Sequence, residues 1–74
     1  MIYTVKETLA TLSTTTSTAK KLTLTSWNGA PAKLDLRTWY ETDDGERPGR
    51  GVPLTEAEAE SLFNVLDDYL EAEY

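Results

Sequence analysis

The 74-residue chain contains no cysteine and no histidine. The missing cysteines exclude a disulfide framework, a thiolate nucleophile and the usual zinc sites. The missing histidines remove the commonest general base at neutral pH, and with it triads and deaminase sites. No apolar run approaches the roughly 20 residues of a membrane helix, and no segment reads as a signal peptide. We expect a cytoplasmic, non-enzymatic protein that uses no metal or cofactor and contacts no membrane. Catalysis by carboxylates alone is the enzymatic alternative.

Charge is distributed unevenly along the chain. Seven basic and 13 acidic residues give a net charge of −6. Residues 1–40 hold five basic and two acidic residues, a balance of +3, whereas residues 41–74 hold two basic and eleven acidic residues, a balance of −9. The negative net charge of the whole chain therefore argues against non-specific nucleic-acid binding, whereas the positive net charge of residues 1–40 is compatible with it.

Residues 1–74 read as one α+β domain in which strands precede a helix. Alternating residues predict strands over about 2–12, 20–27, 33–40 and 50–54. Leu12 breaks the first alternation, so we expect a bulge or bend near Ala10. Asn28-Gly29 predicts a hairpin turn. Composition marks 13–18 as a Ser/Thr connector and 41–49 as a loop.

The final segment, 55–72, has the pattern of a capped amphipathic helix. Thr55 and Glu58 stand at the spacing of a capping box. The apolar stripe is wide, and a chain of this length buries only about 60% of its unfolded surface. We therefore expect a homodimer in which a second helix covers the stripe. The expected interface residues are Leu62, Phe63, Leu66, Tyr69 and Leu70.

The central hairpin has two chemically different faces. Leucines, among them Leu24 and Leu36, fall on one face, which we expect to be buried. The opposite face, expected to be open to solvent, carries Trp27, Trp39 and three cations, which are Lys21, Lys33 and Arg37. Aromatic rings that stack bases beside cations that contact phosphates are the means of binding single strands. The alternative is that the tryptophans cover a second small core or a dimer seam. Asp35 on the same face could orient Arg37 or Lys33 through a salt bridge.

A second basic segment follows the expected loop. Arg47 and Arg50 flank Pro48-Gly49, and arginine beside glycine suits phosphate oxygens. An ordinary turn with two solvated arginines explains the same residues.

Two stretches resemble the transcriptional positive cofactor four family. They are SWNGAPAKLDLRTW at residues 26–39 and PGRGVPLT at residues 48–55, in the family's order and before a capped helix. The resemblance implies a curved four-stranded antiparallel sheet followed by one C-terminal helix, assembled as a two-fold homodimer. It also implies binding of single-stranded DNA, or RNA, across the sheets, and a role as a transcription regulator or coactivator that contacts the transcription machinery.

Applied position by position, the resemblance predicts which residues contact nucleic acid and where in the cell the protein acts. The implied nucleic-acid contacts are Trp27, Lys33, Arg37, Trp39, Arg47 and Arg50, with Tyr40 near an aromatic position of some members. Lys20 and Lys21 lie where the family has basic residues that enter the second strand, and we include Lys21 among the expected contacts. In a bacterial host it implies association with the nucleoid. The turn Ala30-Pro31-Ala32 departs from the family, whose turn is often richer in Lys and Arg. The alternative function is a protein-interaction module that keeps this fold without binding nucleic acid.

Overall fold

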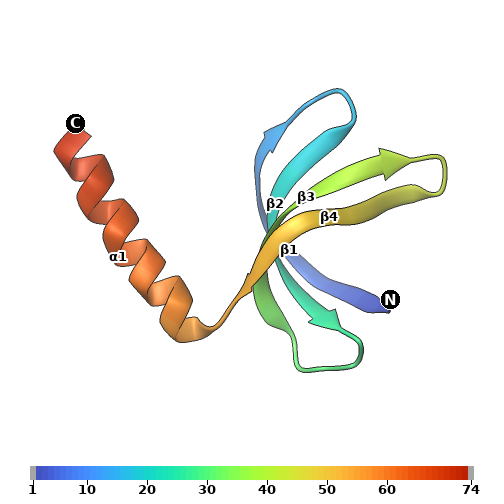
Figure 1. Cartoon of the computed structure of the whole chain (residues 1–74), viewed down its shortest axis with the longest axis horizontal. Coiled ribbons are helices and arrows are strands. Elements are labelled where there is room, and N and C mark those ends of the chain that lie inside the picture. Colours follow the sequence, from blue (N-terminus) through green and yellow to red (C-terminus); the bar gives the residue numbers. More distant parts are fainter. Residues whose placement is uncertain (1, 74) are drawn as a thin grey trace.

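Four strands and one helix follow one another in the computed structural model, which describes residues 2–73 (Figure 1). They are β1 (Tyr3–Thr14), β2 (Thr18–Trp27), β3 (Lys33–Thr42), β4 (Gly45–Leu54) and α1 (Glu56–Glu73). Each strand pairs with its chain neighbour in an antiparallel sheet of order β1-β2-β3-β4. The predicted α+β class is confirmed. The end residues of the expected domain 1–74, Met1 and Tyr74, lie outside the described residues.

The hairpin between β2 and β3 turns where the sequence predicts. Asn28 and Gly29 adopt φ of 53° and 81°, and the Ala30 amide donates to the Trp27 carbonyl at 3.0 Å. Two successive positive φ angles give the turn a twist that matches the flanking strands, which explains the choice of Asn-Gly.

The other two connections are much shorter than composition suggests. The segment 41–49 is largely strand, because β3 runs to Thr42 and β4 already begins at Gly45. The connector 13–18 shrinks to a turn between Thr14 and Thr18. Pro48 and the acidic residues of this segment favour a loop, but β4 is an edge strand, where a missing backbone donor is tolerated.

β1 carries three irregularities in its pairing with β2. One of the register shifts lies between Thr8 and Ala10, which confirms the bend predicted near Ala10. Each bulge increases local twist and bends the strand. As a result, β1 curls over one face of the sheet, and residues that are not on neighbouring strands touch there. The Tyr3 ring, for example, lies 5.6 Å from the Trp39 ring of β3.

The helix begins with the predicted capping box. The Glu58 amide donates to the Thr55 hydroxyl at 3.1 Å, and the Thr55 amide donates to the Glu58 carboxylate at 2.8 Å. The two side chains thus satisfy amides that have no intrahelical partner. From this cap α1 runs away from the sheet, and its main contacts with the strands are with β4 (Figure 1).

The buried residues of this chain lie on the face opposite the leucines. Ala19, Thr23, Thr25, Asp35 and Trp39 are the buried residues among those described, and strand alternation places all of them on the curled-over face. The expectation that Leu24 and Leu36 are buried is wrong for the single chain, since both are only half-buried. The reason is that α1 stands apart from the leucine face instead of covering it.

Candidate nucleic-acid interface

The curled-over face, here called the aromatic face, is organised around a buried ion pair. Asp35 is 0% exposed and accepts two hydrogen bonds from Arg37, from Nε at 2.5 Å and from Nη2 at 2.7 Å. The remaining terminal nitrogen of Arg37 donates to the Gly49 carbonyl of β4 at 3.1 Å. The salt bridge that the sequence suggested for Asp35 is therefore present, and it occupies the guanidinium.

Arg37 also fixes the ring of Trp27. Its guanidinium carbon lies 4.4 Å from the centre of the Trp27 ring, within the range of a cation–π contact. Tyr3 supports the same ring from β1, with ring centres 5.4 Å apart. Trp27 is thus held between two neighbours while remaining partly accessible.

A cavity of about 220 Å³ opens beside this stack. It is lined by Trp27, Lys33 and Arg37, together with Ala30, Pro31 and Pro53. Lys33 is exposed and has no ion pair among the described residues. The cavity therefore brings together three of the predicted contact residues, and it combines the Trp27 ring, the unpaired Lys33 ammonium and apolar walls.

Two exposures expected on this face are wrong. Trp39 points to the predicted side, but it is only 3% exposed because β1 curls over it. Arg37 was expected to be accessible, yet its side chain is 14% exposed because Asp35, Gly49 and Trp27 surround it. The alternative interpretation, in which the tryptophans cover a second small core, describes Trp39 correctly. Contact of either residue with nucleic acid stays a prediction.

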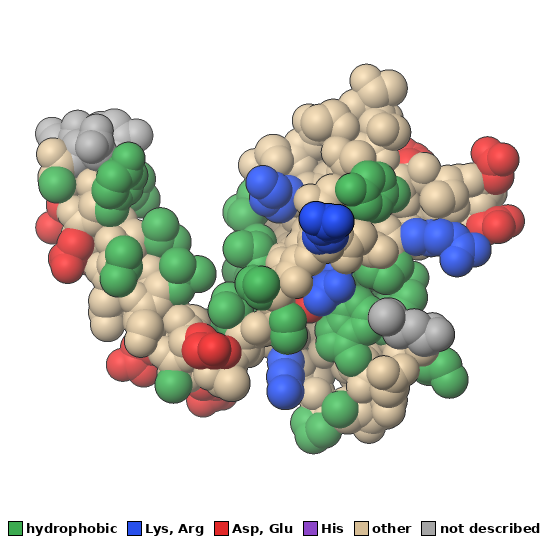
Figure 2. All heavy atoms as spheres, in the orientation of Figure 1, with side chains coloured by type: hydrophobic (Ala, Val, Ile, Leu, Met, Phe, Trp, Pro, Cys, Tyr) green, Lys and Arg blue, Asp and Glu red, His purple; other side chains and the backbone are tan. Residues whose placement is uncertain are grey.

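The remaining predicted cations are distributed along the sheet. Lys21 donates to the Glu46 carboxylate at 2.7 Å, and Arg47 lies 3.6 Å from Asp44 at the β3–β4 turn. Arg50 is exposed, without an ion pair in the described part of the chain. Figure 2 shows the Lys and Arg side chains over the sheet, and acidic side chains on the helix and at the hairpin tip. Lys33 and Arg50 are thus the predicted contacts whose charges are uncompensated.

Sequence reasoning missed Tyr3 and Glu46, which complete the aromatic face. Both lie on the outer strands β1 and β4, and their roles depend on how far the sheet curls. Alternation along one strand carries no signal for contacts between strands that are not neighbours. Gly51 of β4 pairs with Arg37 of β3, and a Cβ at this position would collide with Arg37. A glycine at this position is therefore a sequence signal that the two strands pack closely here.

The predicted interface residues of α1 form an uncovered apolar face. Leu62, Phe63, Leu66, Tyr69 and Leu70 are all exposed, Phe63 to 66%. Part of this face borders a cavity of about 280 Å³ whose other wall is the leucine face of the sheet. Figure 2 shows the two apolar surfaces facing each other across open space.

The described residues contain neither a cluster of metal-binding side chains nor a membrane-spanning helix. Among residues 2–73, no acidic residues gather in a group of three that could hold a metal ion. No helix in that range has the length and the apolar character needed to cross a membrane.

The architecture, a four-stranded antiparallel sheet that leads through a capped turn into one helix, defines an α+β protein with an aromatic and basic sheet face. The sequence signature of the family described as "Transcriptional Coactivator p15 (PC4)" matches residues 14–65. This match spans most of the chain, so the protein belongs to that family, as the two stretches of the sequence predict. Tyr3 and most of β1 lie before the matched residues.

A relative in Treponema pallidum (strain Nichols) is described only as "Uncharacterized protein". It is 45% identical to this chain over 42 residues, which is 57% of this chain and 47% of the relative. The chain therefore spans about half the length of the curated relative that it matches.

Proposed function

We propose that this protein is a homodimeric, non-catalytic binder of single-stranded DNA that acts in transcription regulation. Membership of the Transcriptional Coactivator p15 family supports this function. The structural observation that carries it is the cavity in which Trp27 and Lys33 lie side by side. A base would stack on the ring, and the neighbouring phosphate would meet the ammonium.

Dimer formation is supported by the two uncovered apolar surfaces. The leucine face of the sheet and the apolar face of α1 are both at least partly exposed in one chain, and a monomer rarely leaves such surfaces open. A two-fold axis brings the same patch from both copies together, so that each copy covers the other. The second copy would take up the space between the helix and the sheet.

The ion pairs separate the predicted contact residues into neutralised and unpaired cations, and we base the proposed contacts on this difference. Arg37 is neutralised by Asp35, so we assign it a supporting role beneath Trp27. Lys33 and Arg50 would bind phosphates directly. Tyr40 is 47% exposed and pairs across the strands with Arg47, which offers a second aromatic surface beside a cation. Association with the nucleoid of a bacterial host would follow from this function.

Fluorescence anisotropy with labelled oligonucleotides tests the proposal. The wild type should bind single strands of many sequences at micromolar concentration in low salt and bind duplexes more weakly, because duplex bases are already stacked. Trp27→Ala should cost about 1–3 kcal/mol of binding free energy, the scale of base–aromatic stacking. Circular dichroism would verify that this variant is folded.

A matched pair of lysine variants separates local contact from overall charge. Lys33→Gln should make the salt dependence shallower by about 0.7 in the slope of log K against log salt, the value for one lost phosphate contact on a single strand. Lys6→Gln removes the same charge from an exposed position on β1 outside the cavity and should leave that slope unchanged. Equal affinity for single strands and duplexes, or no binding, would favour the protein-interaction module instead.

A further inference from the structure

Glu46 connects the strands on the two sides of β3. Its carboxylate accepts a hydrogen bond from Lys21 of β2 at 2.7 Å. Its backbone carbonyl accepts a long hydrogen bond, 3.5 Å, from the hydroxyl of Tyr3 on β1. Because the sheet order is β1-β2-β3-β4, both contacts pass over β3, which carries Trp39. Glu46 therefore closes the aromatic face across its width.

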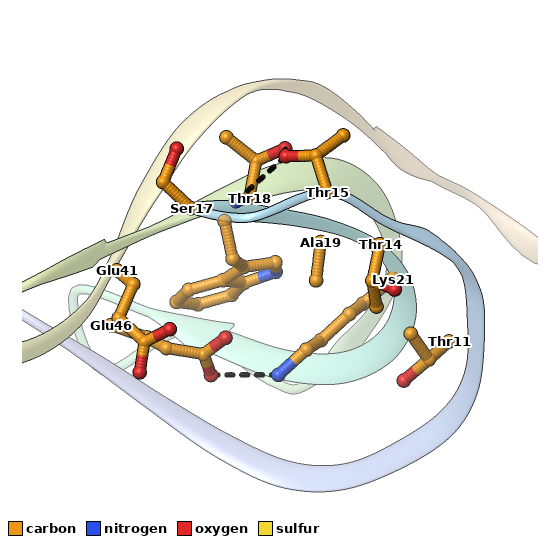
Figure 3. Close-up of a pocket in the computed structure, with 10 residues that line it drawn as sticks. Thr11, Thr14, Thr15, Ser17, Thr18, Ala19, Lys21, Glu41 and Glu46 are labelled. Atoms are coloured by element: carbon orange, nitrogen blue, oxygen red, sulfur yellow. Dashed lines mark hydrogen bonds and ion pairs between the residues drawn. The ribbon is translucent and has the colours of Figure 1, made fainter.

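Two cavities meet at this closure. One has a volume of about 260 Å³, and threonine and serine hydroxyls make up much of its lining (Figure 3). The other, of about 250 Å³, extends toward β1. Lys21, Trp39 and Glu46 line both. In Figure 3 the side chains of Lys21 and Glu46 point toward each other along one side of the first cavity, and Thr15 and Thr18 lie at the opposite side.

The groups around these cavities suit a nucleotide. Hydroxyls can donate to and accept from a base edge, and the Trp39 ring offers a flat apolar surface. The buried Nε1 of Trp39 has no acceptor among the described residues, although buried donors are usually paired. The ammonium of Lys21 could bind the phosphate of such a nucleotide, but it is paired with the Glu46 carboxylate.

The Lys21–Glu46 pair is suited to exchange. The Lys21 side chain is 19% exposed and that of Glu46 42% exposed, so solvent reaches both partners. Pairs of this kind hold together weakly because water and salt screen them. A phosphate offers the same ammonium a charge-assisted contact with more acceptor oxygens.

We propose that Glu46 occupies, in the unbound protein, the place of a phosphate in a second nucleotide subsite. When a single strand binds, one phosphate replaces the carboxylate on Lys21, and the adjoining base enters the hydroxyl-lined cavity beside Trp39. This inference rests on the proposed binding of single strands. It assigns Lys21 and Trp39 a contact that opens only when Glu46 moves away.

The first test measures affinity with and without the competing carboxylate. Glu46→Gln should tighten binding of a labelled single strand about fivefold, the upper range for releasing an exposed ion pair. Glu41→Gln is the matched control, because Glu41 faces Glu46 across the strands and lines the same cavity without pairing with Lys21. It removes an equal charge and should change affinity much less. In a Lys21→Gln background, Glu46→Gln should give no gain.

The second test places the base. In Trp27→Phe, Trp39 is the remaining tryptophan, and a saturating single strand should quench its emission. Equal gains from the two glutamate variants, a gain that persists without Lys21, or unchanged Trp39 emission at saturation would overturn the subsite and leave single-strand binding intact. Absence of binding by the wild type and every variant would overturn both proposals.

Discussion

Arg37→Ala is the substitution whose expected effect the structure changes most. Viewed as a cation on an open sheet face, Arg37 would contribute under about 1 kcal/mol to folding. In the structure it is the ion-pair partner of a carboxylate that is 0% exposed. Truncation to alanine would leave that carboxylate buried without a counter-charge, while the polar contact to Gly49 and the stack on Trp27 would also be lost.

The expected loss follows from the burial of Asp35. Removing one partner of a buried ion pair destabilises a protein by about 3–5 kcal/mol, mainly through the uncompensated charge that remains. Lys33→Ala is the matched control, since it removes an exposed, unpaired cation from the same face of β3 and should cost under about 1 kcal/mol. Adding Asp35→Asn to Arg37→Ala should recover part of the loss, because an amide carries no charge to compensate.

Urea denaturation at one fixed protein concentration measures these differences. Arg37→Ala should lower the midpoint while leaving the dependence on urea unchanged, which indicates a change in stability alone. The fixed concentration matters because a dimer gains stability with concentration. A loss below about 1 kcal/mol for Arg37→Ala, or equal losses for Arg37→Ala and Lys33→Ala, would refute the assignment of Arg37 to the buried network.

Two further substitutions test the assembly and the sheet. Phe63→Glu should dissociate the proposed dimer and lower its stability, because an apolar interface would have to bury a charge. Sedimentation velocity would detect the dissociation, and Asn64→Glu on the polar side of the helix is the control. A well-folded wild-type monomer at micromolar concentration would contradict the proposed dimer. Gly51→Ala should cost about 1–3 kcal/mol in thermal unfolding, because the new Cβ would collide with Arg37 and with the Leu36 carbonyl. Gly29→Ala should also be destabilising, but through its φ of 81°, since a Cβ there meets no atom within 4 Å; a loss below about 0.5 kcal/mol for Gly51→Ala would contradict the collision.

Local signals in the sequence predict local structure well in this chain. The Asn28-Gly29 turn, the bend near Ala10 and the cap formed by Thr55 and Glu58 all appear where the residues predict them. Each depends on atoms a few residues apart or on one adjacent strand. The alternation along β2 and β3 likewise assigns Leu36 and Arg37 to opposite faces correctly.

Burial was not predictable from the same patterns. Alternation identifies the two faces of the sheet but does not indicate which face the rest of the chain covers. Its apolar residues favour burial of the leucine face. Here the bulged β1 covers Trp39 and Asp35, whereas α1 leaves the leucines half-exposed. The curl of β1 and the direction of α1 decide the outcome, and both arise from contacts between distant parts of the chain.

The projecting acidic helix has a consequence for the kinetics of binding. The acidic side chains described on α1 include Glu56, Glu60 and Asp67, and no basic residue occurs in its last turn (Figure 2). If the protein binds single strands as proposed, an approaching polyanion would meet this repulsion at long range, where ions screen it, before it reached Lys33 at close range. Added salt should then accelerate the encounter while it weakens the contacts that hold the strand. Association and dissociation rates should both rise with ionic strength, so the lifetime of the complex would report its contacts more directly than the affinity does.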